Sequence, residues 1–353
     1  MSYLSQAAYL NQHSLNEENV MVTILNQTQT LISQYIASVL AAHPHLVQLQ
    51  DLPIIYNRHL DDQLIPILSG GGSGGGSGHE PAHSGFVGDG MLSAAIYGDI
   101  FTPPTATDIL EALRFLDKGK GVFVIIKNFE ADIREFSQAI HLARQEGRNI
   151  KYIISHDDIS VEPKKQFQMR HRGLAGTVLL HKILGAAAQS GTSLDDLEHL
   201  AFDLATEIAT IGFATKSASL PNAALPLFDL PDHQISYGIG IHGEEGYRTV
   251  PFMSSEHLAV EIVNKLQIKF HWQEDEHFIL LVNNLGTATD LEQGIFLNDI
   301  HQLLDLEGLH LPFIKNGKFM TSLDMTGISV TLCRLKDRQW LDYLQAPTNA
   351  YAW

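Results

Sequence analysis

Two kinds of apolar pattern alternate along the chain: short continuous runs, and longer segments in which apolar residues recur every three or four positions. The continuous runs predict buried strands at residues 64–68, 121–126 and 150–154. The spaced segments predict helices at residues 131–146, 176–188 and 194–211. This alternation of strands and helices predicts an α/β domain with a largely parallel sheet.

A second series of elements begins near residue 209. Strands are predicted at 235–241, 278–282 and 328–333, and a helix is predicted at 295–306. The proline-bearing stretch 220–231 is typical of a connector. We therefore predict an N-terminal extension at 1–20 and two α/β domains at 21–208 and 209–353, each with a mixed or largely parallel sheet flanked by helices.

One more helix is predicted close to the N-terminus. The sequence Ser14-Leu-Asn-Glu17 has the form of a capping box and precedes spaced apolar residues. The helix is expected to run from there to about residue 40, and His43-Pro-His45 is expected to mark its end. Residues 1–20 are interpreted as an extension with no function of their own.

The composition restricts the class of protein. The chain has 353 residues, 44% of them hydrophobic, and no run approaches the roughly 20 apolar residues that span a bilayer. A formal net charge of −17 argues against direct binding to nucleic acid, which needs clustered Lys and Arg. The N-terminus lacks the features of a secretory signal, and the single cysteine, Cys333, excludes an internal disulfide. These features predict a cytoplasmic protein with no membrane segment.

A glycine-rich loop is the first candidate for binding chemistry. It follows the predicted strand 64–68, contains repeated Gly-Gly-Gly-Ser units and ends at His79. The backbone N–H groups of glycines can approach a small polar ligand closely because no Cβ intervenes. Three other polar motifs also follow predicted strands, at 127–132, 239–246 and 283–286. Because ligands of open α/β sheets bind at the carboxyl ends of strands, we expect these motifs to converge.

His242 is the strongest candidate for a reactive group. It stands between two glycines just past a predicted strand, and Glu244 and Glu245 follow it. An imidazole with an ordinary pKa near about 6.5 is mostly neutral at cytoplasmic pH, so its free nitrogen can attack a carbonyl carbon. His79 and Asp132 can then hold hydroxyl groups or move a proton. The alternative is a surface histidine in a tight turn.

The segment His79-Glu-Pro-Ala-His83 also matches the H-E-x-x-H pattern of zinc hydrolases. That chemistry needs both histidines on one face of a helix, whereas a glycine loop leads into this segment and Pro81 lies within it. Pro81 fits only the first turn of a helix, and no third ligand is evident nearby. The loop also lacks both the Gly-Lys-Ser/Thr ending of a P-loop and the Rossmann spacing, so neither a metal nor a nucleotide is expected.

Together these motifs resemble the dihydroxyacetone kinase family, specifically its substrate-binding K subunit, DhaK. The resemblance runs from about residue 21 to the end of the chain. It is carried by motifs at residues 68–72, 77–83, 88–95, 100–105, 125–128, 240–244, 282–286 and 321–327.

The resemblance implies a ligand and a role for each site residue. The K subunit of this family binds dihydroxyacetone as a covalent hemiaminal on a histidine, which the Gly-Ile-His-Gly-Glu motif places at His242. The residues that contact the substrate hydroxyls and assist phosphoryl transfer map to His79 and Asp132, and Gly76 and Lys127 also line the site. The nucleotide of the family lies on a separate L domain or subunit, so no cofactor is expected here. The resemblance also implies a homodimer.

The chain departs from the kinase pattern around these residues. The usual Lys-Asn-Tyr-Thr-Gly-Asp reads Lys-Asn-Phe-Glu-Ala-Asp at 127–132, and Gly-Glu-Pro-Gly reads Gly-Glu-Glu-Gly at 243–246. Gly-Arg-Arg-Gly reads Arg-His-Arg-Gly at 170–173, and the glycine loop carries one additional Gly-Gly-Gly-Ser unit. Glu130 and Glu245 therefore add negative charge where a phosphoryl donor would approach.

These departures predict a noncatalytic paralogue of the K subunit: a coactivator that binds dihydroxyacetone and associates with a TetR-like regulator, DhaS, of the kinase operon. The first alternative is an active K subunit that accepts phosphate from a separate L subunit, DhaL. The second alternative is a zinc hydrolase that uses His79 and His83.

Overall fold

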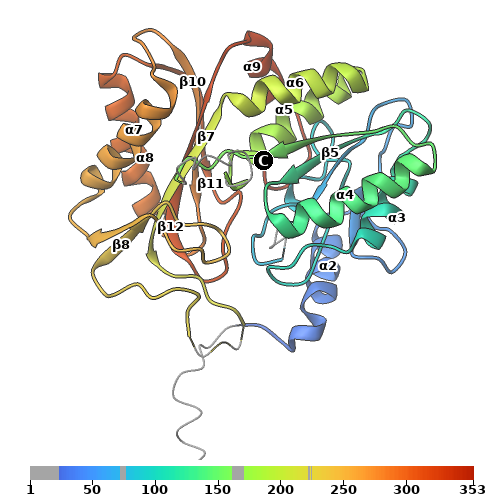
Figure 1. The fold of residues 1–353 in the computed structure, drawn as a ribbon, viewed down its shortest axis with the longest axis horizontal. Coiled ribbons are helices and arrows are strands. Elements are labelled where there is room, and N and C mark those ends of the chain that lie inside the picture. Colours follow the sequence, from blue (N-terminus) through green and yellow to red (C-terminus); the bar gives the residue numbers. More distant parts are fainter. Residues whose placement is uncertain (1–23, 72–76, 161–170, 222, 224) are drawn as a thin grey trace, which may run out of the picture.

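The fold is a stack of alternating helical and sheet layers (Figure 1). The structure, a computed structural model, describes residues 24–71, 77–160, 171–221, 223 and 225–353. One sheet uses strands from the first half of the chain and the other uses strands from the second half. The layers place the carboxyl ends of the central strands of the first sheet next to loops of the second.

The first sheet is mixed. Strands β4, β3, β5 and β6 run parallel, with β6 at one edge, whereas β1 and β2 add antiparallel pairs at the other edge. Every residue of β5 is buried, as expected for an inner parallel strand with helices on both faces. In spatial order the strands are β1 (Leu46–Gln48), β2 (Ile54–Asn57), β4 (Ala94–Ile96), β3 (Ile67–Gly70), β5 (Val122–Lys127) and β6 (Ile150–Ser155).

The second sheet is mainly antiparallel, with a single parallel pair between β10 and β11. Long inner strands carry its core, and the short strands β8 and β9 extend one edge. In spatial order the strands are β11 (His310–Gly317), β10 (His277–Asn284), β12 (Thr326–Arg334), β7 (Ile208–Lys216), β8 (Gln234–Tyr237) and β9 (Arg248–Pro251).

Helices separate and cover the sheets, and three apolar clusters follow from this layering. Helices α3 (Ala106–Leu116) and α4 (Glu130–Gln145) cover the outer face of the first sheet. Helices α7 (Ser255–Phe270) and α8 (Asp290–Leu306) cover the outer face of the second. The largest cluster lies between the sheets, around α5. The remaining helical elements are η1 (Thr28–Thr30), α2 (Leu31–Ala42), η2 (Ser84–Phe86), α5 (Thr177–Gln189), α6 (Leu194–Thr206) and α9 (Arg338–Gln345).

The two-sheet α/β class predicted from the sequence is confirmed, with differences at several element ends. The helix predicted at 194–211 is wrong beyond Thr206, because residues 208–211 start strand β7. Ile208 and Ile211 are β-branched and buried between layers, a setting that favours a strand over a further helical turn. The strand predicted at 64–68 lies further along the chain, as β3.

Two more predictions differ at a turn and at the N-terminus. Strand β8 ends at Tyr237 rather than at residue 241, because Gly238 adopts a φ of 73° and turns the chain. Residues 24–27 are not helical, and the predicted N-terminal helix starts only at α2. It ends beside His43, as predicted. The capping box at 14–17 and the extension 1–20 lie outside the described residues, and the boundary at 208/209 stays a prediction.

Over the described ranges, no helix combines the length and the apolar composition required to cross a bilayer.

Two helical glycines, one in the central layer and one on an outer layer, are expected to respond in opposite ways to replacement by alanine. A Cβ on Gly185 in α5 would lie 2.3 Å from Cα of Met91, whereas a Cβ on Gly294 in α8 meets nothing within 4 Å. Gly185→Ala is therefore expected to destabilise the fold by about 1–3 kcal/mol through overpacking. Gly294→Ala is expected to stabilise it by up to about 1 kcal/mol, because alanine favours helix. Urea unfolding midpoints measure both, and equal midpoints would contradict the close packing of α5.

Candidate functional site

Strand ends of the first sheet and one loop of the second meet at a buried polar site. Strand β3 leads into the glycine loop that ends at His79, and β5 ends at Lys127 just before α4. The turn at Gly238 carries the chain from β8 to His242. The predicted convergence of these motifs is therefore found in the structure.

His79 is fully buried, and its two ring nitrogens differ in their hydrogen bonding. Its Nδ1 lies 2.6 Å from the carbonyl oxygen of Thr321, so Nδ1 carries the proton and donates it to that oxygen. Within the described part of the chain, Nε2 has no hydrogen-bond partner. Burial, together with the charges of Lys127 and His242, holds the pKa of His79 well below its ordinary value. A neutral ring with an open acceptor nitrogen results.

His242 shows the same arrangement. Its Nδ1 lies 3.2 Å from Oε1 of Glu244, whose Oε2 accepts the backbone N–H of His242 at 2.9 Å. An ionised carboxylate can only accept, so Nδ1 carries the proton and Nε2 keeps its lone pair. Among the described residues, nothing hydrogen-bonds to this buried Nε2. Burial lowers the pKa of His242, although the hydrogen bond to Glu244 opposes the shift.

The two imidazoles face each other across a small aromatic frame. Their centroids are 4.8 Å apart with the rings nearly perpendicular. Phe101 stacks on His79 at 5.0 Å, and Phe129 meets the edge of His242 at 4.3 Å. These phenyl rings place apolar surface against both imidazoles, which favours their neutral forms.

Lys127 supplies a buried amine to the same site. Its side chain is fully buried, and its Nζ has no hydrogen-bond partner in the ranges that the structure describes. Burial lowers its pKa to about 8, although Asp132, Glu244 and Asp157 favour the charged form. Lys127 is therefore still mainly cationic at neutral pH, and its charge acts on both histidines.

Asp132 lies in the first turn of α4 and is fully buried. A carboxylate in this position is stabilised by the amino-terminal end of the helix. Gly71 packs against this carboxylate: a Cβ on Gly71 would lie 2.3 Å from Oδ1 of Asp132, and Gly71 has a φ of 73°. Glycine is thus required at residue 71 both for its conformation and for its close approach to the carboxylate.

The asparagine motif at 283–286 has a supporting role. Oδ1 of Asn283 accepts the backbone N–H groups of Phe319 and Met320 at 2.9 and 3.0 Å. The next residue, Thr321, holds His79 through its carbonyl oxygen, and Ser322 donates to the carbonyl of Ile241 at 2.6 Å. The 319–322 segment therefore anchors both histidine loops. Residues 321 and 322 lie in a motif that carried the resemblance, but the sequence did not indicate this anchoring role, since backbone contacts leave little signal in a sequence.

A second pair of buried histidines, His83 and His181, lies beside Ser69 of strand β3. His83 and His181 have centroids 5.1 Å apart, and Nε2 of His181 lies 3.3 Å from Oγ of Ser69. The segment 79–83 is a series of turns rather than a helix, and His79 faces His242 while His83 faces His181. Within the described ranges, no group of three metal-ligating side chains is assembled. The helical geometry required by the H-E-x-x-H interpretation is thus not found.

The remaining predicted features lie at the border of the site. Glu130 and Glu245 are exposed, within three residues of Asp132 and His242 respectively. Gly76 and the loop segment 72–76 lie outside the described residues. Phe101, Phe129 and Arg172 all lay in motifs that were compared with the family, but the sequence did not assign a role in the site to any of them.

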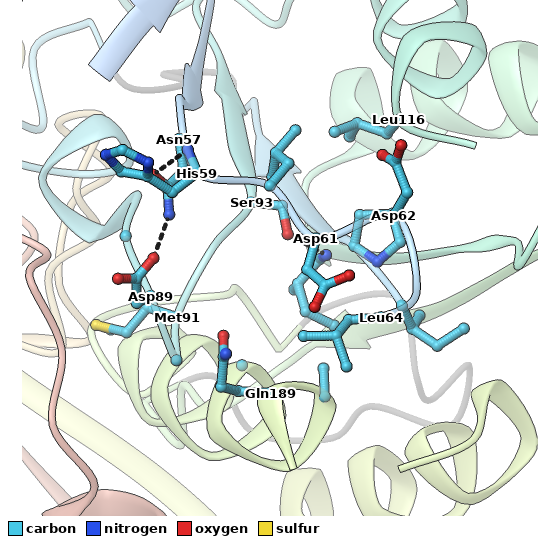
Figure 2. Close-up of a pocket in the computed structure, with 18 of the residues that line it drawn as sticks. Asn57, His59, Asp61, Asp62, Leu64, Asp89, Met91, Ser93, Leu116 and Gln189 are labelled. Atoms are coloured by element: carbon cyan, nitrogen blue, oxygen red, sulfur yellow. Dashed lines mark hydrogen bonds between the residues drawn. The ribbon is translucent and has the colours of Figure 1, made fainter. Parts of the chain in front are cut away.

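A separate polar pocket lies at the opposite end of β3 (Figure 2). Asn57, Asp61, Asp62 and Asp89 line it, and Nδ2 of Asn57 donates to Oδ1 of Asp89 at 2.7 Å. None of the predicted site residues lines this pocket. It is therefore distinct from the histidine site.

The fold and the site define a two-sheet α/β protein with a pair of neutral histidines whose Nε2 atoms are buried, an arrangement suited to a small carbonyl compound. Residues 37–352 match the Dak1 domain, and the chain belongs to the Dak1 family. This agrees with the resemblance found in the motifs.

Two curated relatives cover almost the whole chain. The chain is 50% identical over 330 residues to the DhaKLM operon coactivator DhaQ of Lactococcus lactis subsp. lactis (strain IL1403), covering 93% of this chain and 99% of the relative. It is 43% identical to the PTS-dependent dihydroxyacetone kinase, dihydroxyacetone-binding subunit DhaK of the same strain, covering 94% and 98%. A solved structure of the dihydroxyacetone kinase operon co-activator Dha-DhaQ has a TM-score of 0.86 at 50% identity, covering 91% of this chain and 97% of that one.

Proposed function

We propose that this protein is a noncatalytic dihydroxyacetone-binding coactivator, which captures its ligand as a hemiaminal on His242 and activates a TetR-like regulator of the DhaS type. One observation carries the binding part of the proposal. Nε2 of His242 is buried, has no partner among the described residues, and belongs to a ring whose Nδ1 faces Glu244. That is the tautomer required of a nitrogen nucleophile.

The capture step is an addition that needs no other reagent. The Nε2 lone pair attacks the carbonyl carbon, a C–N bond forms, and the carbonyl π pair moves to oxygen. The oxygen takes up one proton while Nδ1 releases one toward Glu244, so protons and electrons balance. Glu244 stabilises the positive charge that develops on the ring during the step.

The surrounding residues suit a short ketone with hydroxyl groups. Nε2 of His79 offers an acceptor, Lys127 offers a cationic donor, and Asp132 adds a carboxylate in the same region. Dihydroxyacetone has one carbonyl and two hydroxyls to match these groups, whereas glycerol has no carbonyl for His242 to attack. Covalent capture therefore selects the ketone over the polyol.

Negative charges at the border of the site favour a role as coactivator over a role as kinase subunit. Glu130 and Glu245 are exposed where the kinase pattern has uncharged residues, and they disfavour approach of a polyanionic phosphoryl donor. The relative named as an operon coactivator shares 50% identity, against 43% for the kinase subunit of the same strain. With a net charge of −17, the protein is proposed to act on transcription through a protein partner rather than on DNA.

The second candidate is an active K subunit that takes phosphate from a DhaL subunit. Retention of His79 and Asp132, together with 43% identity to the kinase subunit, favours it. In either case we propose a cytoplasmic homodimer that holds no nucleotide of its own. A protein that retains the ligand groups and lacks the donor surface fits the coactivator better.

Phosphoryl transfer distinguishes the two candidates. The protein is mixed with dihydroxyacetone and a DhaL subunit charged with a phosphoryl donor, and dihydroxyacetone binding is measured in parallel by calorimetry. We expect binding without turnover. Turnover at a rate typical of kinases, about 1–100 per second, would overturn the coactivator proposal. Asp132→Asn is the control, because it removes turnover from a true kinase subunit while leaving the ligand bound.

A further inference from the structure

Arg172 joins the two halves of the histidine site. Its side chain is only 12% exposed and belongs to the segment between β6 and α5. Its Nε donates to Oδ2 of the fully buried Asp158 at 2.5 Å. Its Nη2 donates to the carbonyl oxygen of Gly238 at 2.9 Å, at the turn where the His242 loop begins.

The same guanidinium also reaches the carboxylate that orients His242. Nη1 of Arg172 lies 3.9 Å from Oε2 of Glu244, and Glu244 contacts His242 through both carboxylate oxygens. Burial raises the pKa of Glu244, but the hydrogen bond with His242 and the charge of Arg172 outweigh it and lower that pKa to about 2. Arg172 thus helps to keep Glu244 ionised while remaining outside the ligand site.

Gly240 allows this approach. A Cβ at residue 240 would lie 2.0 Å from Oε2 of Glu244 and 2.4 Å from Nη1 of Arg172. Any larger residue would push the carboxylate and the guanidinium apart. The sequence Gly-Ile-His-Gly-Glu therefore needs its first glycine for an ion pair that a sequence motif cannot show.

We propose that Arg172 is a positioning residue that acts through Glu244, fixing the tautomer and orientation of His242 from the opposite half of the molecule. The inference rests on the proposed capture of a carbonyl ligand by His242. An ionised, fixed Glu244 holds the proton on Nδ1 and leaves Nε2 open toward His79. Without Arg172, Glu244 loses the guanidinium 3.9 Å away and keeps the weaker influence of Lys127, so the imidazole is free to exchange tautomers.

The groups that face His242 determine its response to pH. Glu244 favours the imidazolium, whereas burial and the charges of Lys127 and Arg172 disfavour it, and His79 lies across the site. Removal of Arg172 takes away one of the charges that lower the pKa of His242. Protonation of His242 then blocks capture at a higher pH than in the unaltered protein.

The test compares Arg172→Met and Arg172→Lys with the unaltered protein by NMR with dihydroxyacetone labelled with ¹³C at its carbonyl carbon. The carbonyl signal moves to the position of a saturated carbon when the hemiaminal forms. We expect Arg172→Met to weaken capture roughly 10- to 100-fold, the usual scale for a partner that orients a ligating histidine. We also expect the acid limit of capture to move to higher pH, and Arg172→Lys to restore part of both losses.

Gly240→Ala provides a second variant that keeps both charges and leaves Asp158 paired. It is expected to weaken capture in the same direction, while Gly294→Ala, with open space around it, leaves capture unchanged. If Arg172→Met does not fold, Gly240→Ala decides the question. Normal affinity and an unmoved acid limit in the folded variants would overturn the inference. Absence of the saturated-carbon signal from the unaltered protein would instead overturn the proposed function.

Discussion

His242→Ala is expected to abolish formation of the hemiaminal and to reduce binding of dihydroxyacetone below detection. Alanine removes the only nitrogen of this residue that can bond to the carbonyl carbon. The remaining hydroxyl contacts act on a ligand of six heavy atoms, for which the best possible non-covalent binding is about 1.5 kcal/mol per atom and common values are far lower. Calorimetry and the ¹³C signal of the labelled ligand both measure this loss.

The control for this variant is His156→Ala. His156 is exposed, and its Nδ1 donates only to the carbonyl oxygen of Ile154, at 2.8 Å. We expect its replacement to leave capture unchanged. Undiminished binding by His242→Ala, with a folded protein confirmed by circular dichroism, would show that the covalent assignment is wrong.

Lys127→Met is expected to weaken ligand binding and at the same time to stabilise the empty protein. Lys127 is fully buried with no hydrogen-bond partner for Nζ in the described ranges, so its charge is costly in the absence of ligand. A lowering of its pKa from 10.5 to about 8 corresponds to about 3 kcal/mol at neutral pH. Methionine fills a similar volume without this cost. The stabilisation is expected to stay below that figure, because Asp132 and Glu244 lose a nearby cation.

The contribution of Lys127 to the free energy of unfolding is expected to depend on pH. Between about pH 8 and 10.5, Lys127 is protonated in the unfolded chain but largely neutral in the folded one. The unfolded state then binds more protons, so the contribution of Lys127 to stability rises with pH across this window. Below pH 8 both states bind the proton and the full penalty remains. Lys127→Met is expected to lose this rise.

Urea unfolding of both proteins from pH 7 to 10.5 measures the effect as a difference in unfolding free energy. The difference is expected to favour Lys127→Met at pH 7 and to shrink toward pH 10.5. A variant that is less stable than the unaltered protein at pH 7 would contradict the prediction, and would indicate that the Lys127 cation is paired in the empty site.

The sequence predicted the site well where the chemistry lies in side chains at strand ends. His79, Lys127, Asp132 and His242 all belong to motifs that follow predicted strands, and the structure brings them to one region. Their convergence followed from a general rule for α/β sheets. Their roles in binding stay predictions until they are measured.

The contacts that the sequence did not reveal are made through the backbone or between the layers. Thr321 holds His79 by a carbonyl oxygen, a group that every residue has. Arg172 reaches Glu244 from a distant segment, and no local pattern reports such a contact. The helix that contains α6 was predicted to end too late for a similar reason. The apolar residues from Ile208 onward are compatible with a helix or a strand, and their burial between the layers favours the strand.

The meeting of His79 and His242 has a consequence for how a small molecule can be sensed. The two rings belong to opposite halves of the chain. A ligand bonded to one ring and hydrogen-bonded to the other would link the two halves across the site. Coupling of this kind is reciprocal. A partner that binds the liganded arrangement of the two halves more tightly must raise the affinity for the ligand by the same factor.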